Sequence, residues 1–389
     1  MKNRLQAWLG RKTNSSSFIP EIDGFRFFAI FTVLVYHLNT HLSRVIASAS
    51  IPVDYEADPL YWISREGGIG VNVFFAISGF ILALPFARQH LQSSAPVSLK
   101  GYYMRRLTRL EPPYIISLLV FFVAHLVLLH ENFRDIFPNL LASLFYVHNI
   151  VFDQWSYINP VAWSLEVEVQ FYILAPALAM LFAIRNPSLR RTVIVGVLLL
   201  SLLHYNYNFR MIAEWHLRKS IFMHLHQFLV GFVMADIYLT VWKAKAPDKH
   251  TIFDLLGFGG MAVLFIWNEP FKVFDDILFA IALGVTFISL FRGPVINRFF
   301  TNRWIVIIGG MCYTIYLIHY AMIAFLADHT RSFILRDAGY GINLLLQGAI
   351  ILPLVLGVSG VYFALIERPC MDKDWPKKLM AWIRTGTPK

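Results

Sequence analysis

The sequence is short of charged residues and of cysteine, and both shortages exclude classes of protein. Only 15% of its 389 residues are charged, whereas a soluble domain usually carries about 25%. Cys312 and Cys370 are the only cysteines, so neither a disulfide framework nor a cysteine-based zinc cluster is predicted. Alternation of apolar and polar residues at a period of two is weak, which disfavours a transmembrane β-barrel.

Apolar residues are abundant and occur in long runs. They make up 57% of the chain, and the mean hydropathy is +0.56. Short loops that are basic or contain Pro and Gly separate the runs, which is typical of a polytopic helical membrane protein. We therefore predict an all-α transmembrane helical bundle of about ten spans. Their ranges are 25–42, 69–87, 111–130, 160–184, 192–207, 220–242, 252–267, 275–291, 304–327 and 343–367.

These spans leave no room for a long soluble domain. We predict a cytoplasmic N-terminal segment at residues 1–24, a transmembrane domain at 25–367 and a cytoplasmic C-terminal tail at 368–389. Segment 137–152 is apolar but too short to cross a bilayer comfortably, so we expect it to be re-entrant or interfacial. Any chemistry is therefore expected among the helices and their loops.

The net charge of +10 comes from the loops and does not indicate nucleic-acid binding. With the N-terminus inside, 24 of the 34 Lys and Arg residues lie in inner segments and nine lie in outer loops. Because Lys and Arg accumulate on the cytoplasmic side of membrane proteins, both termini are predicted to be cytoplasmic.

Arg26 and His37 lie eleven residues apart in the first predicted span. Eleven residues are close to three helical turns, so both side chains share one face, about 16 Å apart along the axis. An ionisable pair inside a span is costly and indicates function. The structural alternative is a membrane anchor and a buried histidine bonded to a carbonyl. His41 lies one turn beyond His37, but no carboxylate or cysteine motif accompanies them, so no metal site is predicted.

A basic segment precedes the third predicted span. Arg106 and Arg109 are three residues apart and share a helical face, and Arg105 adjoins them. Guanidinium groups bind phosphates with matching fork geometry, whereas contact with anionic lipid headgroups is the alternative. Together with Arg26 on the inner face, these arginines indicate a cytoplasmic ligand that bears phosphate.

Two further segments place polar groups inside spans. Glu166 and Glu168 lie near the outer end of the fourth span, two residues apart, so they do not share a helix face. A carboxylate there is a candidate functional group whose natural partner is histidine or arginine. Asn72 and Ser78 lie in the glycine-rich segment 67–80, for which tight helix packing is the alternative explanation.

The order of these motifs resembles that of the acyltransferase-3 family of integral membrane O-acyltransferases. The resemblance extends over nearly the whole chain. It rests on the segments IDGFR (22–26), YH (36–37), GVNVFFAISGF (70–80), RRLTR (105–109), WSLEVEVQFY (163–172), YTIYLIH (313–319) and IERP (366–369).

The resemblance implies an enzyme that moves an acyl group, acetyl in the simplest case, from cytoplasmic acyl-CoA to a hydroxyl. The acceptor would be a carbohydrate, glycolipid or glycosylated natural product, and the location a bacterial inner membrane. His37 would be the general base because imidazole titrates near neutral pH, and Glu168 would orient it or stabilise its charge. The expected acyl-CoA ligands are Arg26, Arg105, Arg106 and Arg109; the expected substrate-binding residues are Asn72, Ser78, Trp163, Tyr313 and His319.

The chain departs from the family pattern at several positions. Asn72 replaces a common aspartate, Val169 a common glutamate and Cys312 a common serine. No permanently bound cofactor is expected, because acyl-CoA is a co-substrate. Some relatives carry a C-terminal esterase-like domain, which this sequence does not include, so we expect the chain to act alone or with a separate partner. The alternative function is a transporter or flippase for a lipid-linked or anionic solute, since polar residues in spans also mark transport paths.

Overall fold

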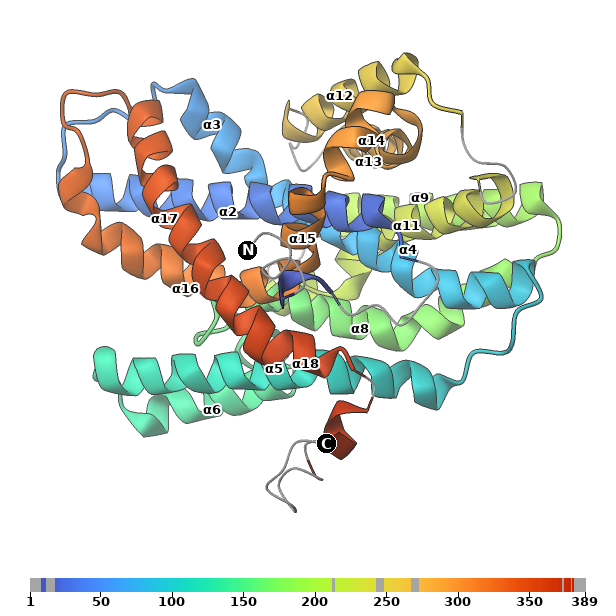
Figure 1. Ribbon diagram of the computed structural model, residues 1–389, viewed down its shortest axis with the longest axis horizontal. Coiled ribbons are helices and arrows are strands. Elements are labelled where there is room, and N and C mark those ends of the chain that lie inside the picture. Colours follow the sequence, from blue (N-terminus) through green and yellow to red (C-terminus); the bar gives the residue numbers. More distant parts are fainter. Residues whose placement is uncertain are drawn as a thin grey trace.

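The computed structural model describes residues 8–11, 18–211, 214–242, 248–266, 273–372, 374–378 and 380. Every regular element in these ranges is a helix, so the all-α prediction is confirmed (Figure 1). The longer helices are α2 (Pro20–Ser48), α4 (Ile69–Leu91), α5 (Leu99–Leu128), α6 (Phe133–Leu144), α8 (Trp163–Leu178), α9 (Pro187–Met211), α11 (Ile221–Ile237), α12 (Thr251–Ile266), α13 (Val273–Arg292), α16 (Cys312–His329) and α17 (Tyr340–Tyr362). Shorter helices are α3 (Pro59–Arg65), α7 (His148–Phe152), α10 (Trp215–Arg218), α14 (Pro294–Phe300), α15 (Arg303–Gly310) and α18 (Arg368–Cys370).

Nine of the ten predicted spans each fall on one helical segment and 304–327 falls on two, α15 and α16. Fewer segments meet the length and composition of a membrane span. In the described ranges, seven helical segments do so, and the bent pair α15–α16 makes an eighth if it is one span. Helix α12 has 16 residues and is shorter than a typical span. Helix α2, with 29 residues, is long enough to cross a bilayer, but its polar side chains lower its mean hydropathy. The chain is thus a multi-pass helical bundle; the count of ten and the cytoplasmic termini stay predictions.

Helix α2 runs through the middle of the bundle. It packs against α4, α15 and α16, and Figure 1 shows it as the long blue helix among them. Pro20 occupies its first turn, where a missing N–H costs nothing. The helix therefore starts five residues before the predicted span and lies where it can present both Arg26 and His37 to neighbouring helices.

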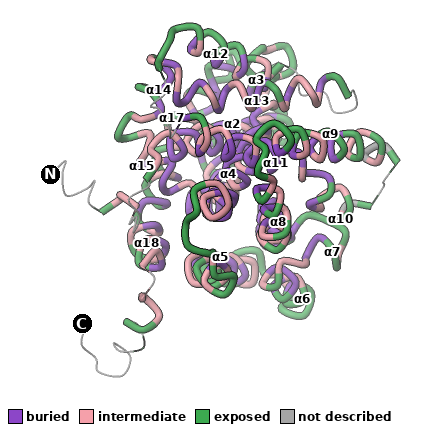
Figure 2. Tube along the Cα trace, turned by 90° about the vertical axis from the view of Figure 1, so that its right-hand side faces the viewer, coloured by how far each residue is buried: buried purple, intermediate pink, exposed green. Residues whose placement is uncertain are grey.

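Glycines let α4 approach its two neighbours closely. A Cβ added to Gly70 would lie 2.2 Å from the backbone oxygen of Ala29 in α2, and one added to Gly79 would lie 2.0 Å from that of Phe228 in α11. The packing explanation for these glycines is therefore confirmed. Buried residues form 67% and 72% of the most apolar stretches of the spans containing α4 and α11, against 28% for α5, α9 and α17. The core thus lies around α2, α4 and α11 (Figure 2).

The predicted span 304–327 is not straight. It consists of α15 and α16, which meet at Met311 with a bend of 70°. Just before the bend, a Cβ at Gly309 would lie 1.7 Å from the backbone oxygen of Asp23, so α15 is pressed against the start of α2. This contact directs α16 along α2 and brings His319 towards His37.

Segment 137–152 forms no span. It comprises most of α6 and the five-residue α7, neither of which is long and apolar enough to cross a bilayer. Helix α6 packs against α5 (Figure 1). The segment is therefore a helical turn-back beside α5 that is too short to cross a bilayer, as predicted. That it is re-entrant or interfacial stays a prediction.

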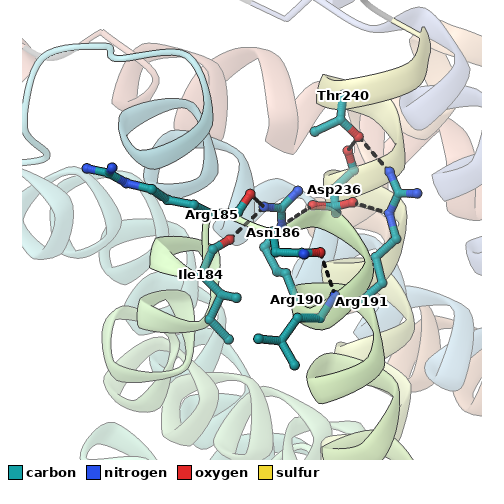
Figure 3. A network of polar contacts seen from close by, with 8 residues as sticks. Ile184, Arg185, Asn186, Arg190, Arg191, Asp236 and Thr240 are labelled. Carbon is teal, nitrogen blue, oxygen red and sulfur yellow. Dashed lines mark hydrogen bonds and ion pairs between the residues drawn. The ribbon is translucent and has the colours of Figure 1, made fainter.

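A buried ion cluster fastens α9 to α11 (Figure 3). The two carboxylate oxygens of Asp236 accept from Arg190 Nε at 2.5 Å and from Arg191 Nε at 2.6 Å. Arg190 also donates to the backbone oxygen of Ile184 at 2.7 Å, and Arg191 to the hydroxyl of Thr240 at 2.8 Å. Since Asp236 and Arg190 are almost fully buried, removing the carboxylate would leave an unpaired buried charge, which typically costs about 3–5 kcal/mol. The cluster is structural.

The predicted topology can be tested with single cysteines in exposed loops. With Cys312 and Cys370 replaced by serine, Ser94→Cys should resist a membrane-impermeant thiol reagent in intact cells, because the loop after α4 is predicted to be cytoplasmic. Ser332→Cys, after α16, should react. Both positions are exposed, so access to the reagent decides the result. Ready labelling of Ser94→Cys in intact cells would show that the predicted orientation is wrong.

Candidate active site

His37 of α2 and His319 of α16 lie against each other within the bundle. Their ring centroids are 5.1 Å apart. His37 is half-buried, and its Nδ1 is buried without a hydrogen-bond partner. His319 is completely buried. The structure thus brings together the predicted base and a residue that the sequence had placed only among the substrate-binding candidates.

The hydrogen bonds of His319 fix its tautomer. Its Nδ1 lies 2.8 Å from the backbone oxygen of Tyr316 and 3.1 Å from that of Ile315. Carbonyl oxygens only accept, so Nδ1 carries the proton and the Nε2 of the neutral ring is an acceptor. That Nε2 is buried and has no partner. His319 therefore offers a lone pair beside the ring of His37.

Tyr320 joins His37 to His41. Its ring centroid is 5.1 Å from that of His37 and 5.0 Å from that of His41. The two histidines of α2 thus both pack against one aromatic ring of α16. Within the described part of the chain, no three or more His, Cys, Asp or Glu residues gather so as to hold a metal ion.

An arginine cluster surrounds the start of α2. The Nη1 atoms of Arg26 and Arg11 both lie 2.6 Å from Asp23 Oδ1. Arg109 of α5 is near enough for its charge to act on Arg11. Burial, together with the charges of Arg109 and Arg26, lowers the pKa of Arg11 to about 10, so Arg11 is still cationic at neutral pH. Three guanidinium groups from three separate segments therefore converge here.

Glu367 closes this arginine cluster on the side of α16. The carboxylate is completely buried and accepts from the Thr314 hydroxyl at 2.5 Å and from the Thr314 backbone N–H at 3.2 Å. The charges of Arg109 and Arg11 also act on it. Its Oε1 has no hydrogen-bond partner. Glu367 thus balances part of the positive charge of the cluster.

Glu168 is placed differently from its predicted role. Its Oε1 accepts a hydrogen bond from the Ser78 hydroxyl of α4, and its charge acts on Tyr172, Arg106 and Arg26. No hydrogen bond or ion pair within the described ranges joins it to His37. The expectation that Glu168 orients His37 therefore finds no contact here, and Ser78 is a partner of Glu168.

Arg106 and Arg109 lie on α5 but have different neighbours. Arg106 stacks over Tyr102, with its guanidinium carbon 3.6 Å from the ring centroid, and lies 5.3 Å from that of Tyr172. It therefore belongs with Glu168, whereas Arg109 faces Glu367 and Arg11. Arg105 is exposed and acts on Arg106 through its charge alone, so the three arginines do not form one cluster.

Glu166 points away from Glu168, as their spacing predicted. It is buried, and its Oε2 accepts from the backbone N–H of Asn149 in α7 at 3.0 Å. This bond ties α8 to the turn-back beside α5. Asn72 is half-buried and makes no hydrogen bond to any described residue. Neither residue meets the histidine pair.

Two other predicted substrate residues lie at the margins of the site. Tyr313 donates to the backbone oxygen of Leu110 at 2.8 Å, which joins α16 to α5. The Trp163 ring centroid lies 3.9 Å from Lys219 Nζ and 5.6 Å from the ring centroid of His224. The residue after it, Ser164, is 2.9 Å from the Tyr316 hydroxyl, so the start of α8 is joined to the helix that carries His319.

Sequence reasoning missed some members of the site. Glu367 lies in one of the segments that carried the family resemblance, so that motif was its available signal. Thr314, its partner, lies in another. Arg11 had no signal beyond its positive charge, because arginines near the start of a membrane protein are common. Only the fold shows that it reaches Asp23.

Comparison with known proteins supports an acyltransferase. A family profile described as an acyltransferase domain matches residues 19–364. A Staphylococcus aureus (strain COL) protein named "Putative O-acetyltransferase" is 27% identical over 342 residues, which cover 82% of this chain and 53% of that protein. No solved structure matches.

A second relative extends the match almost to the full chain. The protein named O-acetyltransferase OatA from Staphylococcus aureus (strain MRSA252) is 25% identical over 413 residues, which cover 96% of this chain and 62% of that protein. The chain therefore spans about half to three-fifths of the length of these relatives. Because the family profile covers most of the sequence, including the paired histidines and two of the three clustered arginines, the chain belongs to the acyltransferase-3 family of membrane O-acyltransferases.

Proposed function

We propose that the protein transfers an acetyl group from cytoplasmic acetyl-CoA to a hydroxyl of a carbohydrate, glycolipid or glycosylated natural product. The observation that carries this proposal is the pair His37–His319, with its unpartnered ring nitrogens, in which His37 lies on the helix that also carries Arg26. The family and the names of the relatives support acyl transfer to oxygen. A bacterial inner membrane is the location we propose. The Lys and Arg bias predicts that the arginines face the cytoplasm, where they could reach CoA.

The arginines form the donor end of the proposed site. Arg26 and Arg109 lie in the cluster around Asp23, and Arg106 lies beside Glu168. Guanidinium groups pair well with phosphate oxygens, so this end would hold the phosphates of CoA. The pantetheine arm would then follow α2 over about 16 Å, the rise of eleven helical residues, and present the thioester near His37.

The histidine pair supplies the proposed proton transfer. A ring nitrogen of His37 takes the proton of the acceptor hydroxyl as its oxygen attacks the acyl carbon. The carbon–sulfur bond then breaks, and the CoA thiolate leaves and takes up the proton. While His37 is charged, the lone pair on His319 Nε2 can accept a hydrogen bond from it. His319 thus fills the supporting role that the sequence had assigned to Glu168.

Transfer and product analysis test the proposal together. Purified protein in nanodiscs should release CoA from radiolabelled acetyl-CoA only when a suitable envelope extract supplies hydroxyls. Mass spectrometry of envelope glycans and glycolipids should show an acetyl ester in cells that have the gene and none in cells that lack it. Absence of both signals, with movement of a lipid-linked or anionic solute across liposomes, would favour the transporter instead.

A further inference from the structure

Arg11 lies outside the segment that matches the family, but in the folded chain it lies beside Asp23 at the proposed donor end of the site. The match begins at residue 19. Arg368 Nε donates to the backbone oxygen of Gly10 at 3.0 Å. The stem of Arg11 passes over Gly310, where an added Cβ would lie 3.1 Å from it. A side chain at residue 310 would therefore press on Arg11, so the glycine leaves room for this path.

The cluster around Arg11 has more positive than negative charge. Arg11, Arg26 and Arg109 meet the carboxylates of Asp23 and Glu367. The charge of Glu168 also acts on Arg26, but it acts on a fourth arginine, Arg106, as well, so four guanidinium groups share three described carboxylates. The Nε atoms of Arg11 and Arg109 are both buried and without partner. A buried donor without an acceptor is costly, more so when it is charged. The arrangement therefore suits an anion with several acceptor oxygens.

Asp23 holds two of the guanidinium groups at a fixed spacing. Both Arg11 and Arg26 reach the same carboxylate oxygen, through one terminal nitrogen each. Each guanidinium has further N–H groups, since it presents five in one plane. Those groups are held together before any ligand arrives, which lowers the entropy lost on binding.

We propose that Arg11 binds a phosphate group of acyl-CoA, so that residues 8–11 form a wall of the donor site. This inference rests on the proposed function. The competing explanation is that Arg11 only ties the N-terminal segment to Asp23. If Arg11 has only this structural role, its loss should impair transfer from all acyl donors alike. If Arg11 binds phosphate, its loss should impair only donors that carry phosphate.

Two acetyl donors separate these explanations. Acetyl-CoA carries phosphates, whereas S-acetyl-N-acetylcysteamine has the same thioester and no phosphate. In the 389-residue chain, Arg11→Ala should raise KM for acetyl-CoA by about tenfold to a hundredfold, the usual effect of losing a charge-assisted hydrogen bond. KM for the truncated donor should not change. Arg11→Gln, which keeps a polar side chain without the charge, should behave likewise if Arg11→Ala folds poorly.

Arg185→Ala is the matched control. Arg185 is exposed on the predicted inner side, and Figure 3 shows its side chain directed away from the Asp236 cluster. Its replacement should leave both KM values unchanged. Both variants are measured in nanodiscs made only of zwitterionic phosphatidylcholine, so that no anionic lipid headgroup is present to bind Arg11. An Arg11 effect that occurs only when phosphatidylglycerol is added would assign Arg11 to lipid and overturn the inference.

If Arg11→Ala raises KM equally for the two donors, Arg11 only holds the N-terminal segment in place. If neither KM changes, Arg11 does not belong to the site. If the wild-type protein transfers acetyl from neither donor, the proposed function fails, and calorimetry with CoA then decides the inference separately. Binding of CoA that weakens in Arg11→Ala would support it. No binding by the wild type, or equal binding by both proteins, would overturn it.

Discussion

Replacing His37 with alanine should reduce acyl transfer by about 10²–10⁴, the usual contribution of a general base. The variant should still insert and fold, because alanine is well tolerated in a membrane helix. It should also bind acetyl-CoA normally, since the proposed phosphate contacts lie about three helical turns away. Turnover per mole of monodisperse protein, measured beside CoA affinity by calorimetry, tests this expectation.

His41→Ala is the control for the His37 variant. His41 lies one turn further along α2 and packs on the same Tyr320 ring, so its loss disturbs similar packing without removing the proposed base. We expect a much smaller effect on transfer. Near-normal turnover in His37→Ala, or an equal loss in both variants, would remove His37 from the mechanism and direct attention to Glu168 and His319.

The helices could be predicted well from the sequence because their physical signal is local. A helix that crosses a bilayer must be apolar over about 20 residues. Every predicted range is helical in the structure, and only 304–327 is divided between two helices, α15 and α16. The bend at Met311 could not be predicted in this way. It depends on the contact of Gly309 with the backbone of Asp23, almost three hundred residues earlier, and the residues on both sides of the bend are equally apolar.

Some residues of the candidate site could be named from the sequence, but their contacts could not. Arg26 and His37 share a face because helical spacing requires it. The partner of His37 cannot be read from spacing, because α2 and α16 are far apart in sequence and either a carboxylate or a second imidazole could satisfy the chemistry. In the structure Glu168 accepts a hydrogen bond from Ser78, and His319 lies beside His37.

The fixed tautomer of His319 is the observation on which its proposed supporting role rests. A histidine that only fills space has no need of a directed lone pair in an apolar interior, where an unpartnered polar atom is costly. Here two backbone carbonyls keep the proton on Nδ1, and Nε2 is left buried beside a second imidazole. Both rings belong to helices anchored near the arginine cluster, since α16 follows Met311 and α2 carries Asp23. The proposed proton acceptor and the proposed acyl-CoA site are thus held by the same two helices.

Replacing His319 with leucine should lower the turnover number by about tenfold to a hundredfold and leave KM for acetyl-CoA unchanged. The reason is that His37 would lose the acceptor that stabilises its charged form, and a charge-assisted hydrogen bond contributes about 1.5–3 kcal/mol. His319→Gln should recover much of the loss, because its amide oxygen can replace Nε2 as acceptor. Steady-state kinetics on both variants, at equal amounts of folded protein, measure the difference. Equal losses in the leucine and glutamine variants would indicate that the shape of His319, and not its lone pair, supports His37.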